Sequence, residues 1–317
     1  MRNSTAGDAM SEPVIRRPES LNRFIPQPLT YAADGLAVRL CGAGGPIPQV
    51  RAACPSIHVA WDGRVPLRVD DRQLRLDDDV FIVLNGYRQL APAGPSDPEA
   101  KLLSVYFAPE GVLQAPNARE PATNRAAALP PTLELFEHLR EHDRPIASVM
   151  RYLAHHLRAG VDDPEWYEEQ VQFLLRRLLE SEAAIALSLE CMTRITPLRR
   201  RDAFARLARV TDLIHSAYER PLGAEDFAKA TEWSALHTLR TFKSVHGVDP
   251  LEYLQRRRAR AAARMLETTS LSAAEVAKHV GFLERSALLH RLRVHALATS
   301  STDHASIGQA MHSAGAY

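Results

Sequence analysis

The chain has 317 residues, which is enough for two domains with separate hydrophobic cores. Hydrophobic residues make up 45% and charged residues 24%, as in ordinary globular proteins. The net charge of +1 excludes a uniformly basic or acidic protein, but the charges are unevenly distributed. From Arg199 onward there are 18 lysines and arginines against 12 aspartates and glutamates, whereas the whole chain has 39 against 38. We therefore expect a polyanionic partner to bind the carboxyl-terminal part.

Cysteine usage and hydropathy narrow the class of protein further. The three cysteines, Cys41, Cys54 and Cys191, are widely spaced and form no CxxC pair, which argues against a disulfide framework or a structural zinc site. The amino-terminal residues have no apolar signal-peptide core, and no run approaches the roughly 18 apolar residues of a membrane span. We expect a cytoplasmic protein that needs no cofactor and does not bind a membrane.

The amino-terminal part reads as a polar tail followed by β structure. Residues 1–25 are polar and are predicted to be disordered. Residues 26–125 are predicted to form a β domain, because short runs rich in branched and aromatic residues alternate with Asp-Gly, Asp-Asp and Asn-Gly turns. The predicted strands are IHVAW, VPLRV, RQLRL, VFIVL and KLLSVYF. Their spacing favours a small barrel or sandwich.

Residues 126–197 are predicted to be a helical region. The runs LELFEHLREH, SVMRYLAHHLRAG and the segment Trp166–Leu189 have helical periodicity. Trp166–Leu189 carries an apolar stripe wide enough for a helix that is buried between neighbours or that pairs with a second copy. We therefore treat residues 126–197 as a linker and dimerisation region.

Residues 198–296 contain one helical unit twice. A short helix, a tight turn and a second helix cover residues 224–246 and again residues 273–294, and a helix from Pro250 to about Thr268 joins them. Asp249 and Ser272 are predicted N-caps, and Gly247 is a predicted C-cap. This is the helix-turn-helix arrangement, in which the second helix enters the major groove of DNA. Residues 297–317 are predicted to be a low-complexity tail. With a β domain followed by two helical regions, the whole chain is predicted to be an α+β multidomain protein.

Candidate DNA-contacting residues lie on the second helix of each unit. Arg240 is the best candidate for reading a base, because a guanidinium can bond both O6 and N7 of guanine. Lys243 suits a phosphate, and His237 suits either a base or a phosphate. The predicted set in the first unit is Ser234, Ala235, Leu236, His237, Arg240 and Lys243. The predicted set in the second unit is Arg285, Ser286, His290 and Arg291.

Four arginines stand within five residues of the linking helix, from Arg256 to Arg260. They cannot all face one side of a helix. Solvation, contact with phosphate and pairing with Asp or Glu remain open for them.

The carboxyl-terminal part resembles the AraC/XylS-type bacterial transcription regulators. The matching residues are Leu222–Ala228 with Ser234; His237 to Lys243; Gly247–Pro250; Tyr253-Leu254; Arg258 to Leu266; Leu271-Ser272; Glu275–Ala277; and Val280–Phe282. The resemblance implies binding to double-stranded DNA and recruitment of RNA polymerase by an activator. It also implies a homodimer and a cupin-type effector domain that binds a small molecule. The sequence does not identify the ligand-binding residues.

Three features depart from the family pattern. Glu232 stands where the turn usually has glycine, so a strained positive φ is expected there. Thr238 replaces a large apolar residue, and no Gly-x-x-Pro follows Ser286. These departures leave open a relative that no longer binds DNA and acts as a small-molecule-binding or interaction protein.

The stretch from His138 to His142 suggests a third alternative, a metal-dependent hydrolase. His138, Glu141 and His142 fit the H-x-x-E-H pattern, which places two histidines one helical turn apart with a carboxylate between them. The prediction requires that residues 133–142 form a helix and that a third metal ligand lie nearby, and no such ligand can be named from the sequence.

Overall fold

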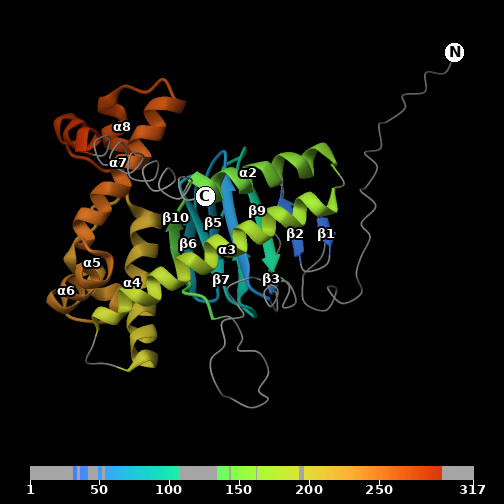
Figure 1. Cartoon of the computed structure of the whole chain (residues 1–317). Helices are drawn as coiled ribbons and strands as arrows, with labels where there is room; N and C mark the ends of the chain where they lie inside the picture. Colours follow the sequence, from blue (N-terminus) through green and yellow to red (C-terminus); the bar gives the residue numbers. More distant parts are fainter. Residues whose placement is uncertain are drawn as a thin grey trace, which may run out of the picture.

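The structure is a computed structural model, and it describes residues 31–33, 36–41, 49–51, 54–107, 134–142, 144–161, 163–192 and 196–294. Strands occupy the amino-terminal part and helices the carboxyl-terminal part, as Figure 1 shows. This confirms the predicted α+β fold class. The predicted tails, residues 1–25 and 297–317, lie outside the described residues.

The strands form two antiparallel sheets that make a sandwich. Their bounds are β1 Tyr31–Ala33, β2 Leu36–Cys41, β3 Val50–Arg51, β4 Ser56–Trp61, β5 Val65–Val69, β6 Arg72–Leu76, β7 Val80–Leu84, β8 Gln89–Pro92, β9 Lys101–Phe107 and β10 Leu139–Glu141. The larger sheet has the order β1-β2-β9-β4-β7-β10, and the smaller sheet has the order β3-β8-β5-β6. All five strands predicted from the sequence are present, as β4, β5, β6, β7 and β9. The sandwich alternative is therefore confirmed over the described residues, whereas the cupin assignment stays a prediction.

Alternation along the strands places two cores on opposite faces of the larger sheet. In β7, the side chains of Val80, Ile82 and Leu84 fill the space between the sheets, while Phe81 and Val83 point to the outer face. This follows from the two-residue period of a strand. Since both faces are covered, β7 is apolar throughout rather than alternating.

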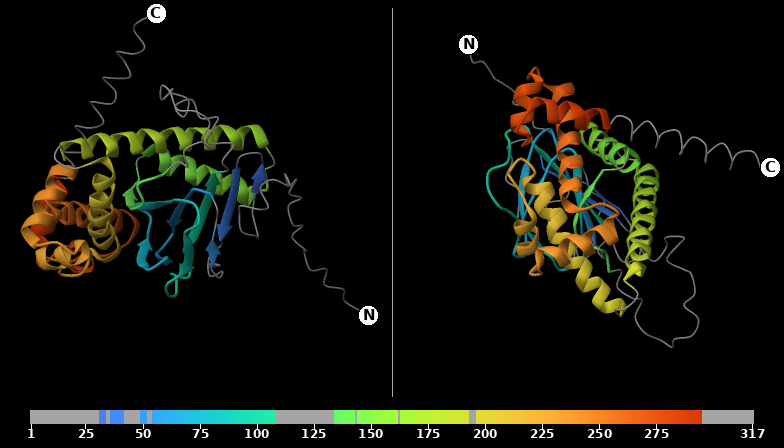
Figure 2. Two further views of the ribbon diagram at one scale, coloured as in Figure 1. Left: turned by 90° about the horizontal axis from the view of Figure 1, so that it is seen from below. Right: turned by 90° about the vertical axis from the view of Figure 1, so that its left-hand side faces the viewer.

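Two helices, α2 (Arg144–Ala159) and α3 (Pro164–Ser188), cover the outer face of the larger sheet (Figures 1 and 2). Asp163 caps α3 by accepting a hydrogen bond from the Trp166 backbone N–H at 3.1 Å. Val171, Leu174 and Leu178 of α3 are buried against the sheet. The apolar stripe predicted over Trp166–Leu189 is thus covered within the chain. Of the two predicted alternatives, the structure shows the first, a helix that is buried against its neighbours.

The helix predicted over residues 133–142 is wrong. Residues 139–141 form β10, which pairs with β7 in the register Leu139↔Ile82 and Glu141↔Val80. The apolar residues of this segment point to separate cores: Leu139 packs inside the sandwich, whereas Phe136 packs against helices further along the chain. The helical spacing of these residues is therefore accidental, and contacts with distant segments determine the strand.

The carboxyl-terminal helices share one core and are called the helical domain here. They are α4 Pro197–Ala217, α5 Ala224–Thr231, α6 Ala235–His246, α7 Pro250–Thr268 and α8 Ala273–His279, followed by a helix over residues 285–294; a short 3-10 turn, η3 Leu189–Cys191, precedes α4. The bounds of α7 match the prediction, and Asp249, Ser272 and Gly247 are the caps that the sequence predicts. Among the described residues, no helix combines the length and apolar character of a membrane span.

Candidate nucleic-acid interface

The first helix-turn-helix unit consists of α5, a short turn and α6. Asp226 accepts a hydrogen bond from the Gly223 backbone N–H at 2.9 Å, which closes the start of α5. Ser234 caps α6 by accepting from the His237 backbone N–H at 3.3 Å. Phe227, Phe242 and Val245 are buried, so each helix turns an apolar face inward.

The turn contains the positive φ that the sequence predicts. Glu232 ends α5 in the left-handed conformation, with φ of 59°. Its carboxylate accepts hydrogen bonds from Arg209 at 3.0 Å and Arg206 at 2.8 Å, which lower the pKa of Glu232. Two arginines of α4 therefore hold a residue that the backbone conformation alone disfavours.

Thr238 is buried at the centre of the unit, where a large apolar residue is usual. Its hydroxyl is 2.7 Å from the hydroxyl of Thr231, which also donates to the Phe227 carbonyl. Both threonines are fully buried. A satisfied pair of hydroxyls thus replaces an apolar contact, and a buried polar group is tolerated only under that condition.

The outward face of α6 carries the residues predicted to meet DNA. Ser234, Leu236, His237, Arg240 and Lys243 are exposed, with Leu236 60% accessible, while Ala235 is half-buried. His237, Arg240 and Lys243 follow one another at intervals of three residues and therefore lie along one side of the helix. The His237 ring also packs edge-on against Trp233, with ring centroids 4.5 Å apart. The exposed face of α6 thus presents the cations Arg240 and Lys243 together with the apolar side chain of Leu236. The sequence of α6 contains no Asp or Glu.

The second unit has the same plan with a longer turn. Gly281 adopts φ of 87° after α8, and the next helix covers residues 285–294. The Leu288 N–H bonds to the Glu284 carbonyl, as the Thr238 N–H bonds to the Ser234 carbonyl, and both Leu288 and Thr238 are buried. By this equivalence, His290 stands in the place of Arg240, and Arg293 in the place of Lys243.

The predicted residues of the second unit divide into two groups. Arg285, Ser286 and His290 are exposed, and so is Arg293. Arg291 is half-buried and donates to Glu252 of α7 at 2.7 Å. Arg291 therefore fastens its helix to α7 in this structure.

The arginine run of α7 is mostly paired within the chain. Arg258 donates to the carbonyls of Tyr218 and Arg220, both at 2.7 Å, and so closes the end of α4. Arg256 pairs with Glu252 on the same helix. Arg257 is fully buried, and its partners are two aspartates of the β sandwich. Arg260 pairs with Glu141 at 2.7 Å. Of the three alternatives left open by the sequence, pairing with Asp or Glu accounts for Arg256, Arg257 and Arg260. From the sequence, the acidic turn that receives Arg257 indicates only a strand boundary, because nothing local identifies its partner.

The hydrolase pattern at residues 138–142 does not come together. The segment is extended, so residues four apart are separated by about 13 Å rather than by one helical turn. His138 is buried and bonds to the Phe136 carbonyl at 3.0 Å, while Glu141 pairs with Arg260 at 2.7 Å. Burial holds the pKa of His138 well below its usual range. Within the described ranges, no group of three or more His, Cys, Asp or Glu is arranged to hold a metal.

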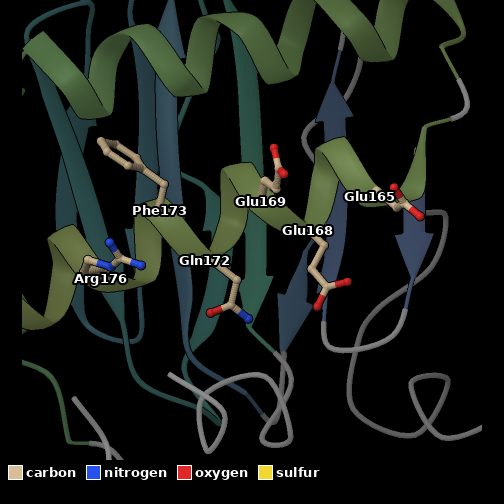
Figure 3. A pocket seen from close by; sticks show the side chains of 6 residues that line it. All are labelled: Glu165, Glu168, Glu169, Gln172, Phe173 and Arg176. Carbon is tan, nitrogen blue, oxygen red and sulfur yellow. The ribbon is translucent and has the colours of Figure 1, made fainter. Parts of the chain in front are cut away.

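Two hollows adjoin the amino-terminal part. One, of about 420 Å³, lies on the surface of α3, and Figure 3 shows that its lining side chains all come from that helix: Glu165, Glu168, Glu169, Gln172, Phe173 and Arg176. The other, of only about 10 Å³, adjoins His58 within the sandwich, where the imidazole contacts the hydroxyls of Ser56 and Ser104 at 2.9 and 2.8 Å. Neither has a lining that identifies a ligand class, so no effector residue is assigned.

Comparisons with known proteins give matches mainly in the carboxyl-terminal part. A family model described as a helix-turn-helix domain matches residues 227–313. The DNA-binding domain of AdpA, described as a global transcriptional factor and solved in complex with a target DNA, is 31% identical; the match covers 28% of this chain and 79% of that one, with a TM-score of 0.26. A Chromobacterium violaceum transcriptional regulator, described as containing an AraC-type DNA-binding domain, is 27% identical over 28% of this chain and 80% of its own, with a TM-score of 0.27.

A longer match, over 82% of this chain and 93% of its own, is ToxT from Vibrio cholerae, at 10% identity and a TM-score of 0.30. No curated protein sequence gives a significant match. The family model covers the two helix-turn-helix units, and the sequence is 31% identical to a DNA-binding domain. The chain therefore belongs to the AraC/XylS-type family of transcription regulators.

Proposed function

We propose that this regulator binds specific promoter sequences through α6 and the helix over residues 285–294. The observation that carries the proposal is the outward face of α6, where Arg240 and Lys243 are exposed while Thr238 and Phe242 anchor the opposite face. Arg240 reads a guanine by a bidentate contact, and Lys243 contacts a phosphate. In the second unit, Arg285, Ser286 and His290 make the corresponding contacts.

The remaining parts of the proposal concern regulation. The β sandwich, within residues 26–125, binds a small-molecule effector, and the DNA-bound protein recruits RNA polymerase in the cytoplasm. The protein acts as a homodimer through the outward face of α3, which has carboxylates at Glu165 and Glu169 and a cation at Arg176. Charges of both signs along one helix face can pair with a second copy in antiparallel orientation. The supporting observation is exposure of this face, since the apolar stripe of α3 is already covered by the sheet.

Selection of random double-stranded DNA by the full-length protein tests the proposal. We expect the wild type to enrich two short sequence blocks about one helical turn apart, since two recognition helices on one face of DNA meet successive major grooves. The Arg240→Ala variant should enrich the same blocks with one base position made degenerate. The matched control is Arg68→Ala, an exposed arginine on β5, which should leave the selected sequence unchanged. Failure of the wild type to enrich any sequence would favour the relative that no longer binds DNA.

A further inference from the structure

Three arginines of α7 form one stripe that meets the β sandwich. Arg257, Arg260 and Arg264 are separated by three and four residues, which places them on one face of the helix. Arg257 donates to Asp77 at 2.5 Å and also pairs with Asp79. The other two arginines pair with carboxylates of the sandwich as well, Arg264 with Asp79 at 2.5 Å and Arg260 with Glu141 at 2.7 Å. Each arginine of the stripe therefore pairs with at least one carboxylate of the β sandwich.

Burial makes these pairs specific to one docked geometry. The side chain of Arg257 is 0% exposed, and those of Asp77 and Asp79 are 3% and 10% exposed. Burial alone would lower the pKa of Arg257, but Asp77 and Asp79 raise it, so the guanidinium stays charged. A buried charge that loses its partner is strongly unfavourable, so these three groups are either all paired, with the two parts docked, or all in water.

A second helix of the helical domain is docked beside the stripe. Asp212 of α4 accepts hydrogen bonds from the Leu139 backbone N–H at 2.7 Å and from Arg72 at 3.1 Å. Glu219, just beyond α4, accepts from Arg75 of β6 at 2.6 Å. Contacts at two separate helices fix the rotation of the helical domain as well as its distance from the sandwich.

The docked arrangement does not cover the candidate DNA-reading residues. Arg240, Lys243, Arg285 and His290 are exposed while the stripe is paired. In Figures 1 and 2, α5 and α6 lie on the side of α4 that is remote from the sheets. The contact is therefore not a shield over the DNA-binding face. The stripe arginines are also not available to phosphates, because carboxylates already occupy them.

We propose that Arg257, Arg260 and Arg264 with Asp77, Asp79 and Glu141 form a latch that positions the helical domain on the β sandwich. In a dimer, the latch sets the spacing and orientation of the two DNA half-sites that are read together. This second statement rests on the proposed function, whereas the first can be measured without DNA. The latch residues are positioning residues, since none of them contacts a base.

The first experiment measures the docking itself. Spin labels are placed at the exposed positions Arg68 on β5 and Lys278 on α8, in a full-length chain with Cys41 and Cys191 replaced by serine. The wild type should give one narrow inter-label distance distribution. The Asp77→Asn, Asp79→Asn variant should give a broad one, because it removes both carboxylates that receive Arg257. The control Asp70→Asn, Asp71→Asn makes the same charge change in an exposed turn and should keep the narrow distribution. A narrow distribution in the Asp77, Asp79 variant would overturn the latch.

Charge exchange guards against a variant that merely misfolds. Arg260 and Glu141 form a one-to-one pair that is partly exposed on both sides. Arg260→Glu alone and Glu141→Arg alone should each broaden the distance distribution, and the combined exchange should narrow it again. Failure of the combined exchange to narrow the distribution, with both single changes broad, would overturn the role of this pair.

The second experiment uses DNA carrying two copies of the selected site at a series of spacings. The wild type should prefer one spacing by about tenfold, as expected when linkage geometry sets the effective concentration of the second site. The Asp77, Asp79 variant should bind a single site within about twofold of the wild type, but its spacing preference should fall to about threefold or less. A variant that only loses structure would bind the single site more weakly as well, so its single-site binding and its spacing preference would fall together.

Retained spacing preference in a variant with broad label distances would refute the positioning role. A wild type that binds no DNA would refute the proposed function, while the label distances would still decide the latch.

Discussion

The two helix-turn-helix units share a plan but stabilise it by different means. In the first unit, a left-handed glutamate closes the turn and two buried threonine hydroxyls meet at the centre. In the second unit, glycine closes the turn, and Leu288 and Val280 are buried at the corresponding places. The comparison shows that the arrangement requires a positive φ and a filled centre, whereas the chemistry that meets each requirement can change. The first unit has the more polar interior, and the second has the tighter backbone contact.

The largest effect is expected at Gly281 of the second unit, where a residue with a side chain does not fit. A Cβ at this position would lie 2.6 Å from the Glu219 carbonyl oxygen, and the φ of 87° is itself unfavourable for a side chain. We expect Gly281→Ala to lower the free energy of unfolding of the helical domain by about 3 kcal/mol or more, from the sum of backbone strain and steric overlap. Chemical denaturation followed by circular dichroism measures this. Gly223→Ala is the control, because a Cβ there meets no atom within 4 Å. Equal loss in both variants would mean that the close approach to Glu219 is unimportant.

Acid should weaken the first unit through His246. Its imidazole stacks on Phe242 with ring centroids 4.2 Å apart, and burial lowers its pKa from 6.5 to about 4. Since the unfolded chain then binds more protons than the folded one between pH 6.5 and 4, stability is present above this window and is lost as pH falls through it. Burial likewise lowers the pKa of His138 and His215, whereas burial raises that of Asp212 to about 6, which acts in the opposite direction.

Replacement of His246 by Phe isolates its share of this acid sensitivity. At pH 5 the variant should gain on the order of 2 kcal/mol relative to the wild type, and at pH 8 the difference should shrink toward the effect of packing alone. Urea unfolding at the two pH values measures the change, with the exposed His279→Phe as the control. A stability difference that is independent of pH would show that the His246 imidazole titrates normally in the folded protein.

DNA recognition should also differ between the units. Arg240 of the first unit can form two parallel hydrogen bonds to a guanine, whereas His290 at the equivalent place can form one. On the selected DNA site, Arg240→Ala should cost about 1–3 kcal/mol of binding free energy, and His290→Ala less than about 1 kcal/mol. Fluorescence anisotropy on the selected site and on random DNA measures both. A larger loss for His290→Ala than for Arg240→Ala would mean that the second unit provides the main specificity.

Local signals explain which parts of the fold were predictable. Asp249, Ser272 and Gly247 act within one turn of their own helix, so the sequence alone located α7, α8 and the end of α6. The strand β10 was missed because its pairing with β7 joins segments about sixty residues apart, and its helical periodicity pointed the other way. The positive φ at Glu232 was predicted from the family pattern.

The candidate site divides in the same manner. The exposed face of α6 follows from helical periodicity, so the sequence predicts that Arg240 and Lys243 lie on it. Their contact with DNA stays a prediction. The partners of Arg257 were not, because Asp77 and Asp79 lie about 180 residues earlier and only the folded chain brings them together. From the sequence, a run of arginines fits a DNA contact, a solvated face or pairing with Asp or Glu, and only the positions of the opposing carboxylates in space decide among the three. The role of Arg291 depends in the same way on Glu252, which lies on another helix.

The smallest expected effect tests how the first unit tolerates Glu232. Glycine at this position would relieve the left-handed strain, which is worth about 1 kcal/mol, but it would remove the contacts with Arg206 and Arg209. Those contacts are largely exposed, and exposed pairs contribute little to stability. We therefore expect Glu232→Gly to raise the free energy of unfolding by up to about 0.5 kcal/mol, and Glu232→Ala, which keeps the strain and loses the pairs, to lower it. If Glu232→Gly instead destabilises the protein as much as Glu232→Ala does, the arginine contacts outweigh the backbone cost, and the first turn is stabilised by its side chains rather than in spite of its conformation.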